Sequence, residues 1–216
     1  APNFAPCKQY IPSLGYGYDY DYTNSEIIIN RMSVDEEGRL ALPHGQKYSI
    51  LVLPDDVRMN SAVLRKLDTL IAAGAIVLGP KPSKYHGLND YENKEKEINA
   101  LAEKIWGSCD GISVKEKAYG KGKLYSGMSI REVLAANNIV PDVTALKGAT
   151  DAEIDWIHRN ADGVDIYMVR NRKSEAITAT VSFNVGSKQP ELWNPMDGKI
   201  IPCTVFKTNG STVELP

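Results

Sequence analysis

The chain has 216 residues, enough for one large domain or two small ones with a sizeable buried core. Its 25 Lys and Arg residues nearly balance 27 Asp and Glu residues, giving a formal net charge of -2, and the charges are spread along the sequence. This balance argues against a protein that binds nucleic acid or an anionic membrane surface. Hydrophobic residues make up 43% and charged residues 24%, which is typical of a soluble globular protein.

The cysteines and the apolar runs exclude further classes. Cys7, Cys109 and Cys203 are too few and too far apart for a disulfide framework or a CxxC zinc site. No apolar run approaches the roughly 20 residues that span a bilayer. The first residues, APNFAPCKQY, contain neither an initiator Met nor the apolar core of a signal peptide. We therefore expect either that an export signal has been removed or that the chain is a piece of a longer protein.

The first 50 residues predict loops and short elements. Residues 1–25 are rich in Pro, Gly and Tyr, which is typical of a loop. The segment from Thr23 to Met32 predicts a short helix with Thr23 or Asn24 as its N-cap. Residues 33–48 predict two short extended pieces separated by turns, as in a hairpin or a sheet edge.

Residues 48–79 carry the clearest architectural signal. The run YSILVLP is almost continuously apolar, which is typical of a strand buried in a parallel sheet. A helix follows, with Asn60 or Ser61 as its cap, Gly74 at its end, and an apolar face of Val63, Leu64, Leu67, Leu70 and Ile71. The run AIVLG then predicts a second strand. This order indicates a βαβ unit and a doubly wound parallel sheet with flanking helices.

The rest of the chain changes character near Pro141. A helix that includes Ile98 and Trp106, a strand-like segment at 117–127 and a helix capped by Ser129 complete the expected α/β layer. Beyond it, short β-type runs separated by Asn, Gly, Pro and Asp turns predict a smaller antiparallel β region. We therefore expect an α/β domain at 1–145 and an antiparallel, sandwich-like segment at 146–216.

The usual catalytic signatures are weak. The turns after the two apolar strands lack the glycines of a GxGxxG fingerprint or a P-loop, and the pair Asp55 and Asp56 is typical of a turn. Ser83 near His86, or Cys109, is a conceivable nucleophile, but neither has the context of a nucleophile elbow. The three histidines, His44, His86 and His158, do not have zinc-ligand spacing. We predict no catalytic residue and no metal ligand in this chain.

The tyrosine segment stands above this background. Tyr16, Tyr18, Tyr20 and Tyr22 alternate with Gly17, Asp19 and Asp21. Flat aromatic rings beside acidic hydrogen-bond acceptors are typical of a sugar-binding surface. The alternative is that these rings pack the loop onto its own domain. Trp156 and Trp193 raise the same choice, and the run ELWNPMDGKI favours a packed hairpin corner.

Ordered motifs over nearly the whole chain resemble one known family. The segments YDYTNSEIIINRMSV, GRLALPHGQKYSILVLPDD, IHRNADGVDIYMVRNR and QPELWNPMDGKI look like the C-terminal part of the glycoside hydrolase family 106 α-L-rhamnosidases. The resemblance implies a flavodoxin-like, class I glutamine amidotransferase-like α/β domain followed by β-sandwich material. It also implies a periplasmic or extracellular bacterial parent enzyme that acts on plant polysaccharide, with calcium as a possible cofactor of that parent.

The resemblance places the catalytic carboxylates in an N-terminal barrel, so none of them is carried onto this sequence. We expect a fragment that lacks the first strand of its sheet, and therefore a possible homodimer through the exposed sheet edge. Our leading hypothesis is a non-catalytic accessory region that meets carbohydrate as part of a rhamnosidase-like enzyme. The alternatives are a free-standing carbohydrate-binding module that uses the four tyrosines and an amidotransferase-like enzyme with an atypical nucleophile.

Overall fold

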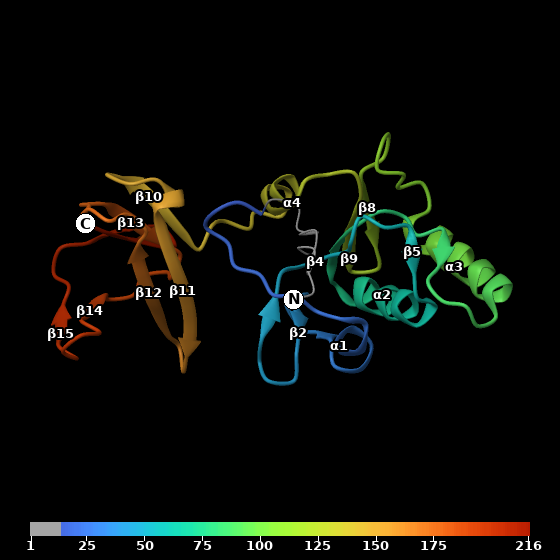
Figure 1. Ribbon diagram of the computed structural model, residues 1–216, viewed down its shortest axis with the longest axis horizontal. Coiled ribbons are helices and arrows are strands. Elements are labelled where there is room, and N and C mark those ends of the chain that lie inside the picture. Colours follow the sequence, from blue (N-terminus) through green and yellow to red (C-terminus); the bar gives the residue numbers. More distant parts are fainter. Residues whose placement is uncertain (1–13) are drawn as a thin grey trace, which may run out of the picture. The chain divides into compact units, whose positions relative to one another are not determined.

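The computed structural model describes residues 14–216 (Figure 1). Contacts between Cα atoms divide these residues into two compact units. The first unit comprises residues 21–137, and the second comprises residues 14–20 together with 138–216. Cys7 and the other residues before Leu14 lie outside the described part of the chain.

Residues 21–137 contain four helices, and all but the third begin at a cap that the sequence predicts. They are α1 (Ser25–Asn30), α2 (Ser61–Ala73), α3 (Tyr91–Trp106) and α4 (Ile130–Ala136). The side chain of Asn24 accepts a hydrogen bond from the N–H of Ile27 at 3.0 Å, and that of Asn60 accepts one from Ala62 at 2.8 Å. Gly74 ends α2. These side chains satisfy backbone N–H groups that a helix leaves unpaired at its start.

The strands of the first unit are short and form three separate sheets. Their bounds are β1 (Ser33–Val34), β2 (Leu40–Ala41), β3 (Lys47–Tyr48), β4 (Ile50–Val52), β5 (Arg58–Met59), β6 (Ile76–Leu78), β7 (Lys84–Tyr85), β8 (Glu116–Tyr119) and β9 (Gly122–Tyr125). The order β1-β2-β3 is antiparallel, which confirms the predicted hairpin region. In the order β4-β6-β9-β8, β4, β6 and β9 are parallel and β8 is antiparallel, while β5 and β7 form a parallel pair.

The predicted flavodoxin-like, class I glutamine amidotransferase-like parallel sheet with flanking helices is wrong. Strand, helix and strand do follow one another as β4, α2 and β6, but the parallel pairing of β4 with β6 covers three residues. Pro54 and Pro80 follow these strands closely, and proline cannot donate to a ladder. The sheet that contains β4 and β6 ends at the antiparallel edge strand β8. The other strands of the unit form small separate sheets. The apolar runs therefore mark buried strands correctly without implying a wide doubly wound sheet.

The core of the first unit lies around α2. The whole predicted apolar face of that helix is buried, together with Val77 of β6, Leu124 of β9, and Ile98 and Trp106 of α3. The indole N–H of Trp106 donates to the carbonyl oxygen of Gly79 at 3.2 Å. The core therefore joins both long helices to the end of β6.

The second unit consists mainly of antiparallel strands. Their bounds are β10 (Val143–Lys147), β11 (Ile154–Ala161), β12 (Val164–Asn171), β13 (Thr180–Phe183), β14 (Glu191–Trp193), β15 (Ile200–Pro202), β16 (Lys207–Asn209) and β17 (Thr212–Leu215), with a 3-10 turn η1 (Asp151–Glu153) before β11. The sheet order is β10-β13-β17-β16, and β11–β12 and β14–β15 are hairpins. The predicted antiparallel region is confirmed, whereas the sequence does not single out β10 and β11 as strands.

The long hairpin β11–β12 has two different faces. Asp162 and Gly163 form its two-residue turn with φ values of 52° and 82°, the left-handed geometry that an Asp-Gly turn adopts. This turn sets a register in which His158 lies opposite Tyr167. Ile154 is buried in a cluster with Val143, Val181 and Phe183, and Trp156 and Tyr167 pack against that cluster. Alternation then directs Ile157, Ile166 and Met168 to the opposite, exposed face.

Within residues 14–216, none of the helices combines the length and the apolar character that a bilayer crossing demands.

Candidate functional site

The tyrosine segment is anchored on the chain that leads into β10. The backbone N–H of Asp142 donates to the carbonyl oxygen of Gly17 at 2.7 Å, and the hydroxyl of Tyr18 donates to the carbonyl oxygen of Ile139 at 3.0 Å. Gly17 is buried with φ +85°, and a Cβ there would lie 2.7 Å from the carbonyl oxygen of Val143. Only glycine combines this backbone conformation with so close an approach. Segment 14–20 is therefore fixed to the rest of the second unit by these two hydrogen bonds and by the close approach at Gly17.

The four predicted sugar-contact tyrosines fall into different settings. Tyr16 and Tyr20 expose 53% and 48% of their surface, whereas Tyr18 is half-buried. These three residues belong to the second unit. Tyr22 is 72% exposed and belongs to the first unit, where neighbouring Asp21 accepts a hydrogen bond from the hydroxyl of Tyr48 at 2.6 Å. The structure thus places Tyr16 and Tyr20 as exposed rings on one anchored segment, with Tyr18 between them.

A polar network lies directly behind this anchor. The carboxylate of Asp142 contacts Nδ1 of His158 at 2.8 Å and accepts a hydrogen bond from the hydroxyl of Tyr167 at 2.6 Å. Nε2 of His158 lies 3.0 Å from Oδ1 of Asp165. The rings of His158 and Tyr167 are stacked, with centroids 4.1 Å apart and an interplanar angle of 11°. The network thus ties both strands of the hairpin to Asp142.

The second carboxylate of the network has further cationic and polar partners. Asp165 forms an ion pair with Lys188 and accepts a hydrogen bond from the side-chain amide of Asn160 at 2.6 Å. Lys188 also donates to the carbonyl oxygen of Gly163 at 2.6 Å. Partial burial alone would raise the pKa of Asp165, but the hydrogen bonds from Lys188, Asn160 and His158 outweigh it and lower that pKa. Asp165 is therefore a carboxylate held in its charged form.

Tyr167 is held in the opposite, neutral form. Burial raises the pKa of its hydroxyl strongly, and the hydrogen bond to Asp142 raises it further, because a phenolate would lie against a carboxylate. Its ring also makes an edge contact with Phe183 at a centroid distance of 4.9 Å. Tyr167 therefore serves as a hydrogen-bond donor that joins the polar network to the apolar core.

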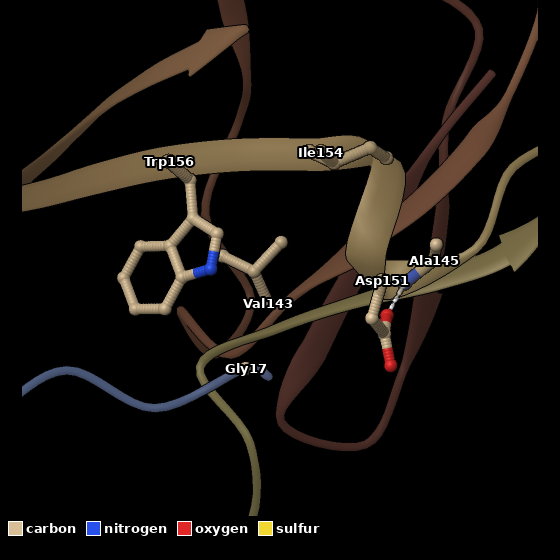
Figure 2. A pocket seen from close by; sticks show the side chains of 6 residues that line it. All are labelled: Gly17, Val143, Ala145, Asp151, Ile154 and Trp156. Carbon is tan, nitrogen blue, oxygen red and sulfur yellow. Dashed lines mark hydrogen bonds between the residues drawn. The ribbon is translucent and has the colours of Figure 1, made fainter. Parts of the chain in front are cut away.

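The cavity beneath this region is too small for a sugar. It is lined by Gly17, Val143, Ala145, Asp151, Ile154 and Trp156 (Figure 2). Its volume is about 10 Å³, which leaves room for about one water molecule at most. Asp151 accepts a hydrogen bond from the backbone N–H of Ala145 at 2.6 Å, which uses this carboxylate structurally (Figure 2). Any carbohydrate contact of the tyrosine segment is therefore a surface contact.

A larger, open hollow lies in the first unit. It has a volume of about 260 Å³ and is lined by Arg58, Tyr85, His86, Gly87 and Leu88. Asp56 accepts hydrogen bonds from Arg58, the shortest from Nη2 at 2.7 Å, and these bonds lower the pKa of Asp56 to about 2. The predicted turn role of the Asp55–Asp56 pair is thus confirmed for Asp56.

The conceivable nucleophiles differ in their surroundings. Cys109 is fully buried, and burial raises the pKa of its thiol, which disfavours the reactive thiolate. Ser83 and His86 are exposed, and their backbone N–H groups donate to Val57 and Met59. In the part of the chain that the structure describes, no group of three or more His, Cys, Asp or Glu side chains could hold a metal ion.

Trp156 and Trp193 also differ from each other. Trp156 lines the small cavity and packs against the core, whereas Trp193 is 61% exposed and donates from its indole N–H to Glu191 at 3.1 Å. The predicted hairpin forms as β14–β15, but the predicted packing of this corner is wrong, because both strands are exposed.

Sequence reasoning missed the network around His158, which it treated as an isolated histidine. The Asp162–Gly163 turn was the available signal, because a two-residue turn fixes His158 opposite Tyr167. Asp142 lies 16 positions from His158 in the sequence, outside the hairpin, and no local pattern indicates that contact.

The comparisons with known proteins agree with the resemblance found in the sequence. The α-L-rhamnosidase model of glycoside hydrolase family 106 matches residues 3–207. The chain belongs to this family. A protein of Formosa agariphila, named "Putative beta-glucuronidase", is 31% identical over 219 residues, which cover 100% of this chain and 17% of that protein.

A solved structure supports the same relationship. The rhamnosidase from Novosphingobium sp. PP1Y is 29% identical to this chain, with a TM-score of 0.83 over 95% of this chain and 19% of that one. The chain thus spans less than a fifth of the length of either relative.

Proposed function

We propose that this chain is a non-catalytic accessory region of an α-L-rhamnosidase-like glycoside hydrolase that acts on plant polysaccharide, and that its second unit contacts carbohydrate through Tyr16 and Tyr20. The family match over residues 3–207 supports the parent activity. The observation that carries the carbohydrate contact is the anchored segment, which holds two exposed tyrosine rings by hydrogen bonds from Asp142 and Tyr18.

An anchored ring suits sugar binding for an energetic reason. Each contact between a sugar and an aromatic face contributes little binding free energy. The entropy lost in ordering the aromatic ring is therefore a large part of the balance. A backbone fixed at Gly17 reduces that cost before the sugar arrives. The acidic neighbours Asp19 and Asp21 supply hydrogen-bond acceptors, but Asp21 already accepts from Tyr48. Asp19 accepts from the N–H of Tyr20 at 2.8 Å and so fixes the backbone beside that ring.

One activity assay distinguishes an accessory role from a catalytic one. The purified chain is incubated with an aryl α-L-rhamnoside and, because one relative is named as a glucuronidase, with an aryl β-glucuronide. We expect no release of the aryl group above that of buffer. Robust turnover of either substrate by this chain would contradict the accessory role.

The carbohydrate contact is tested by calorimetric titration with a soluble pectic oligosaccharide. We expect weak binding that is lost in Tyr16→Ala combined with Tyr20→Ala. Tyr91→Ala is the matched control, since Tyr91 is also an exposed tyrosine but lies on α3 of the first unit. Tyr22→Ala and Trp193→Ala determine whether either of the other exposed rings contributes.

A free-standing carbohydrate-binding module is the alternative that the exposed tyrosines also favour. It predicts that the chain binds the oligosaccharide by itself, without the rest of an enzyme. We also propose that the protein acts in the periplasm or outside the cell, because polysaccharide is the expected substrate of the parent enzyme. Fractionation of the source cells with an antibody against this chain tests that location.

A further inference from the structure

The open hollow of the first unit is built from the segments that leave two parallel strands. β4 and β6 pair in parallel, and the chain after each of them continues into β5 and β7, which also pair in parallel. The hollow is lined by Arg58 of β5, by Tyr85 of β7 and by the three residues after Tyr85. Loops that leave the carboxyl ends of parallel strands converge, and ligands commonly bind where they meet. The position of the hollow therefore suits a binding site.

The size of the hollow limits what it can hold. Its volume is about 260 Å³. Pockets that enclose a whole drug-sized ligand begin at roughly 300 Å³. The hollow therefore fits one ring-sized unit of a longer ligand.

Asp56 holds the guanidinium of Arg58 at one wall. Oδ1 of Asp56 accepts from the backbone N–H of Arg58 at 2.9 Å and from Nε at 3.0 Å, and Oδ2 accepts from Nη2 at 2.7 Å. The side chain of Arg58 is nevertheless 57% exposed. A guanidinium only donates hydrogen bonds, and its planar fork matches a carboxylate. This wall therefore favours a ligand that carries a planar, anionic acceptor.

The ring of Tyr85 forms an apolar wall. Tyr85 is half-buried and packs against the core of the first unit, and its ring centroid lies 6.3 Å from that of Tyr91. A Cβ at Gly87 would lie 2.6 Å from both Cζ and Oη of Tyr85, so the absence of a side chain there makes room for the tip of the ring. Leu88 is 93% exposed and adds a second apolar group. The hollow thus combines an aromatic surface with a guanidinium.

One class of ligand matches both walls. A uronic acid residue carries a carboxylate, which a guanidinium recognises, on a pyranose ring, whose C–H face packs on an aromatic ring. We propose that the hollow binds one uronic acid residue of a polysaccharide, with Arg58 donating to its carboxylate and Tyr85 packing against its ring. The inference rests on the proposed function for the source of the ligand, but the site shares no residue with segment 14–20.

The test is an NMR titration of the ¹⁵N-labelled chain with methyl α-D-galacturonide and, separately, with methyl β-D-glucuronide. We expect saturable shifts at the amides of His86, Gly87 and Leu88 with at least one of these uronides. Binding should be weak, because Asp56 offsets part of the charge of Arg58. The matched neutral sugars are methyl α-D-galactoside and methyl β-D-glucoside. They should bind at least about tenfold more weakly, since they cannot form the charge-assisted hydrogen bonds.

Two variants test the two walls. Arg58→Lys keeps the positive charge but loses the planar fork, and should weaken uronide binding about tenfold. Gly87→Ala places a Cβ against the ring of Tyr85 and should weaken the binding of uronides and neutral glycosides alike. Arg65→Gln is the matched control, because Arg65 is a half-exposed arginine of the same unit that pairs with Glu97. It should leave the titration unchanged.

The outcomes separate this site from the proposed tyrosine contact. The absence of shifts at residues 86–88, equal binding of uronides and neutral glycosides, or unchanged binding in Arg58→Lys would overturn the uronate site. Larger shifts with inorganic phosphate than with either uronide would overturn it as well. If Gly87→Ala does not fold, the exposed Arg58→Lys still decides.

A titration with pectic oligosaccharide completes the comparison. Shifts in segment 14–20 without shifts at residues 86–88 would remove the uronate site and leave the proposed function. Shifts at residues 86–88 that persist when Tyr16 and Tyr20 are both replaced by Ala, with none in segment 14–20 of the wild type, would remove the tyrosine contact and leave the uronate site.

Discussion

The carbonyl oxygen of Gly17 accepts a hydrogen bond from the backbone N–H of Asp142 at 2.7 Å, across 125 positions of sequence that separate the two residues (142 − 17). This bond belongs to the second unit, in which the early segment 14–20 packs with the chain that begins at residue 138. Segment 14–20, with Tyr16, Tyr18 and Tyr20, therefore belongs to the second unit, although the first unit follows it in the sequence.

Gly17→Ala should destabilise the second unit. A residue with a Cβ is strained at φ +85°, and that Cβ would lie 2.7 Å from the carbonyl oxygen of Val143 and 2.8 Å from Cβ of Pro141. We expect a loss of about 2 to 4 kcal/mol in the free energy of unfolding, measured by urea denaturation. Gly186→Ala is the control, because Gly186 has φ +70° in open space, and should lose about 1 kcal/mol. Equal losses would show that the contact with β10 is unimportant.

Tyr167→Phe should remove an alkaline dependence of stability. The pKa of Tyr167 is raised in the folded protein above its ordinary value of 10.0 by burial and by Asp142. The neutral form is favoured on folding, so this contribution is present below about pH 10 and is lost as the pH rises above it. Denaturation at a series of alkaline pH values should show a smaller decline for Tyr167→Phe than for the wild type.

At neutral pH the same variant should lose about 1 kcal/mol, because the carboxylate of Asp142 loses a hydrogen-bond donor while the stacked ring remains. Tyr48→Phe is a suitable comparison, since Tyr48 also donates to an aspartate, but through an exposed hydrogen bond in the first unit. An identical alkaline decline in wild type and Tyr167→Phe would contradict the assigned environment of Tyr167.

Cys109 should resist thiol reagents in the folded protein. It is fully buried, and burial raises the pKa of its thiol, so the thiolate is scarce and inaccessible. The experiment uses Cys7→Ser, which removes the thiol outside the described residues. We expect Cys109 to be modified only as fast as the chain unfolds, as determined by peptide mapping. Rapid, selective modification of Cys109 under native conditions would revive a nucleophilic role.

Ser129→Ala should weaken the start of α4. The N–H of Ser129 donates to Glu132 at 2.7 Å, and the hydroxyl of Ser129 accepts from the N–H of Glu132 at 3.3 Å. Loss of such a capping box costs about 1 kcal/mol, which denaturation of the first unit should report. Ser113→Ala, at an exposed loop position, should cost far less, and comparable losses would argue against the capping role.

Local patterns predicted the elements better than the fold. The ends of three helices follow from the chemistry of single residues, because side-chain acceptors suit a helix start and glycine suits a helix end. These residues are Asn24, Asn60 and Ser129 at helix starts and Gly74 at a helix end. The apolar run at β4 predicts a buried strand correctly. It does not predict the width of the sheet, because the number of strands that pair depends on segments far along the chain. The family resemblance suggested a wide parallel sheet that the three-residue pairing of β4 with β6 does not form.

In the candidate site, too, local sequence patterns indicate single residues but not the contacts between distant segments. Tyr16 and Tyr20 were singled out by composition, and their exposure agrees with a surface role without testing it. The contacts of Asp142 with Gly17 and His158 join separate segments, so no spacing rule predicts them. The Asp162–Gly163 turn alone would have placed His158 beside Tyr167.

The most direct test of the account is an NMR titration of the ¹⁵N-labelled chain with a soluble pectic oligosaccharide, followed residue by residue. We predict saturable shifts in segment 14–20 that extend to Asp142, and their loss when Tyr16 and Tyr20 are both replaced by Ala. Shifts confined to the hollow lined by Arg58, Tyr85 and His86, or no shifts at any concentration, would contradict it.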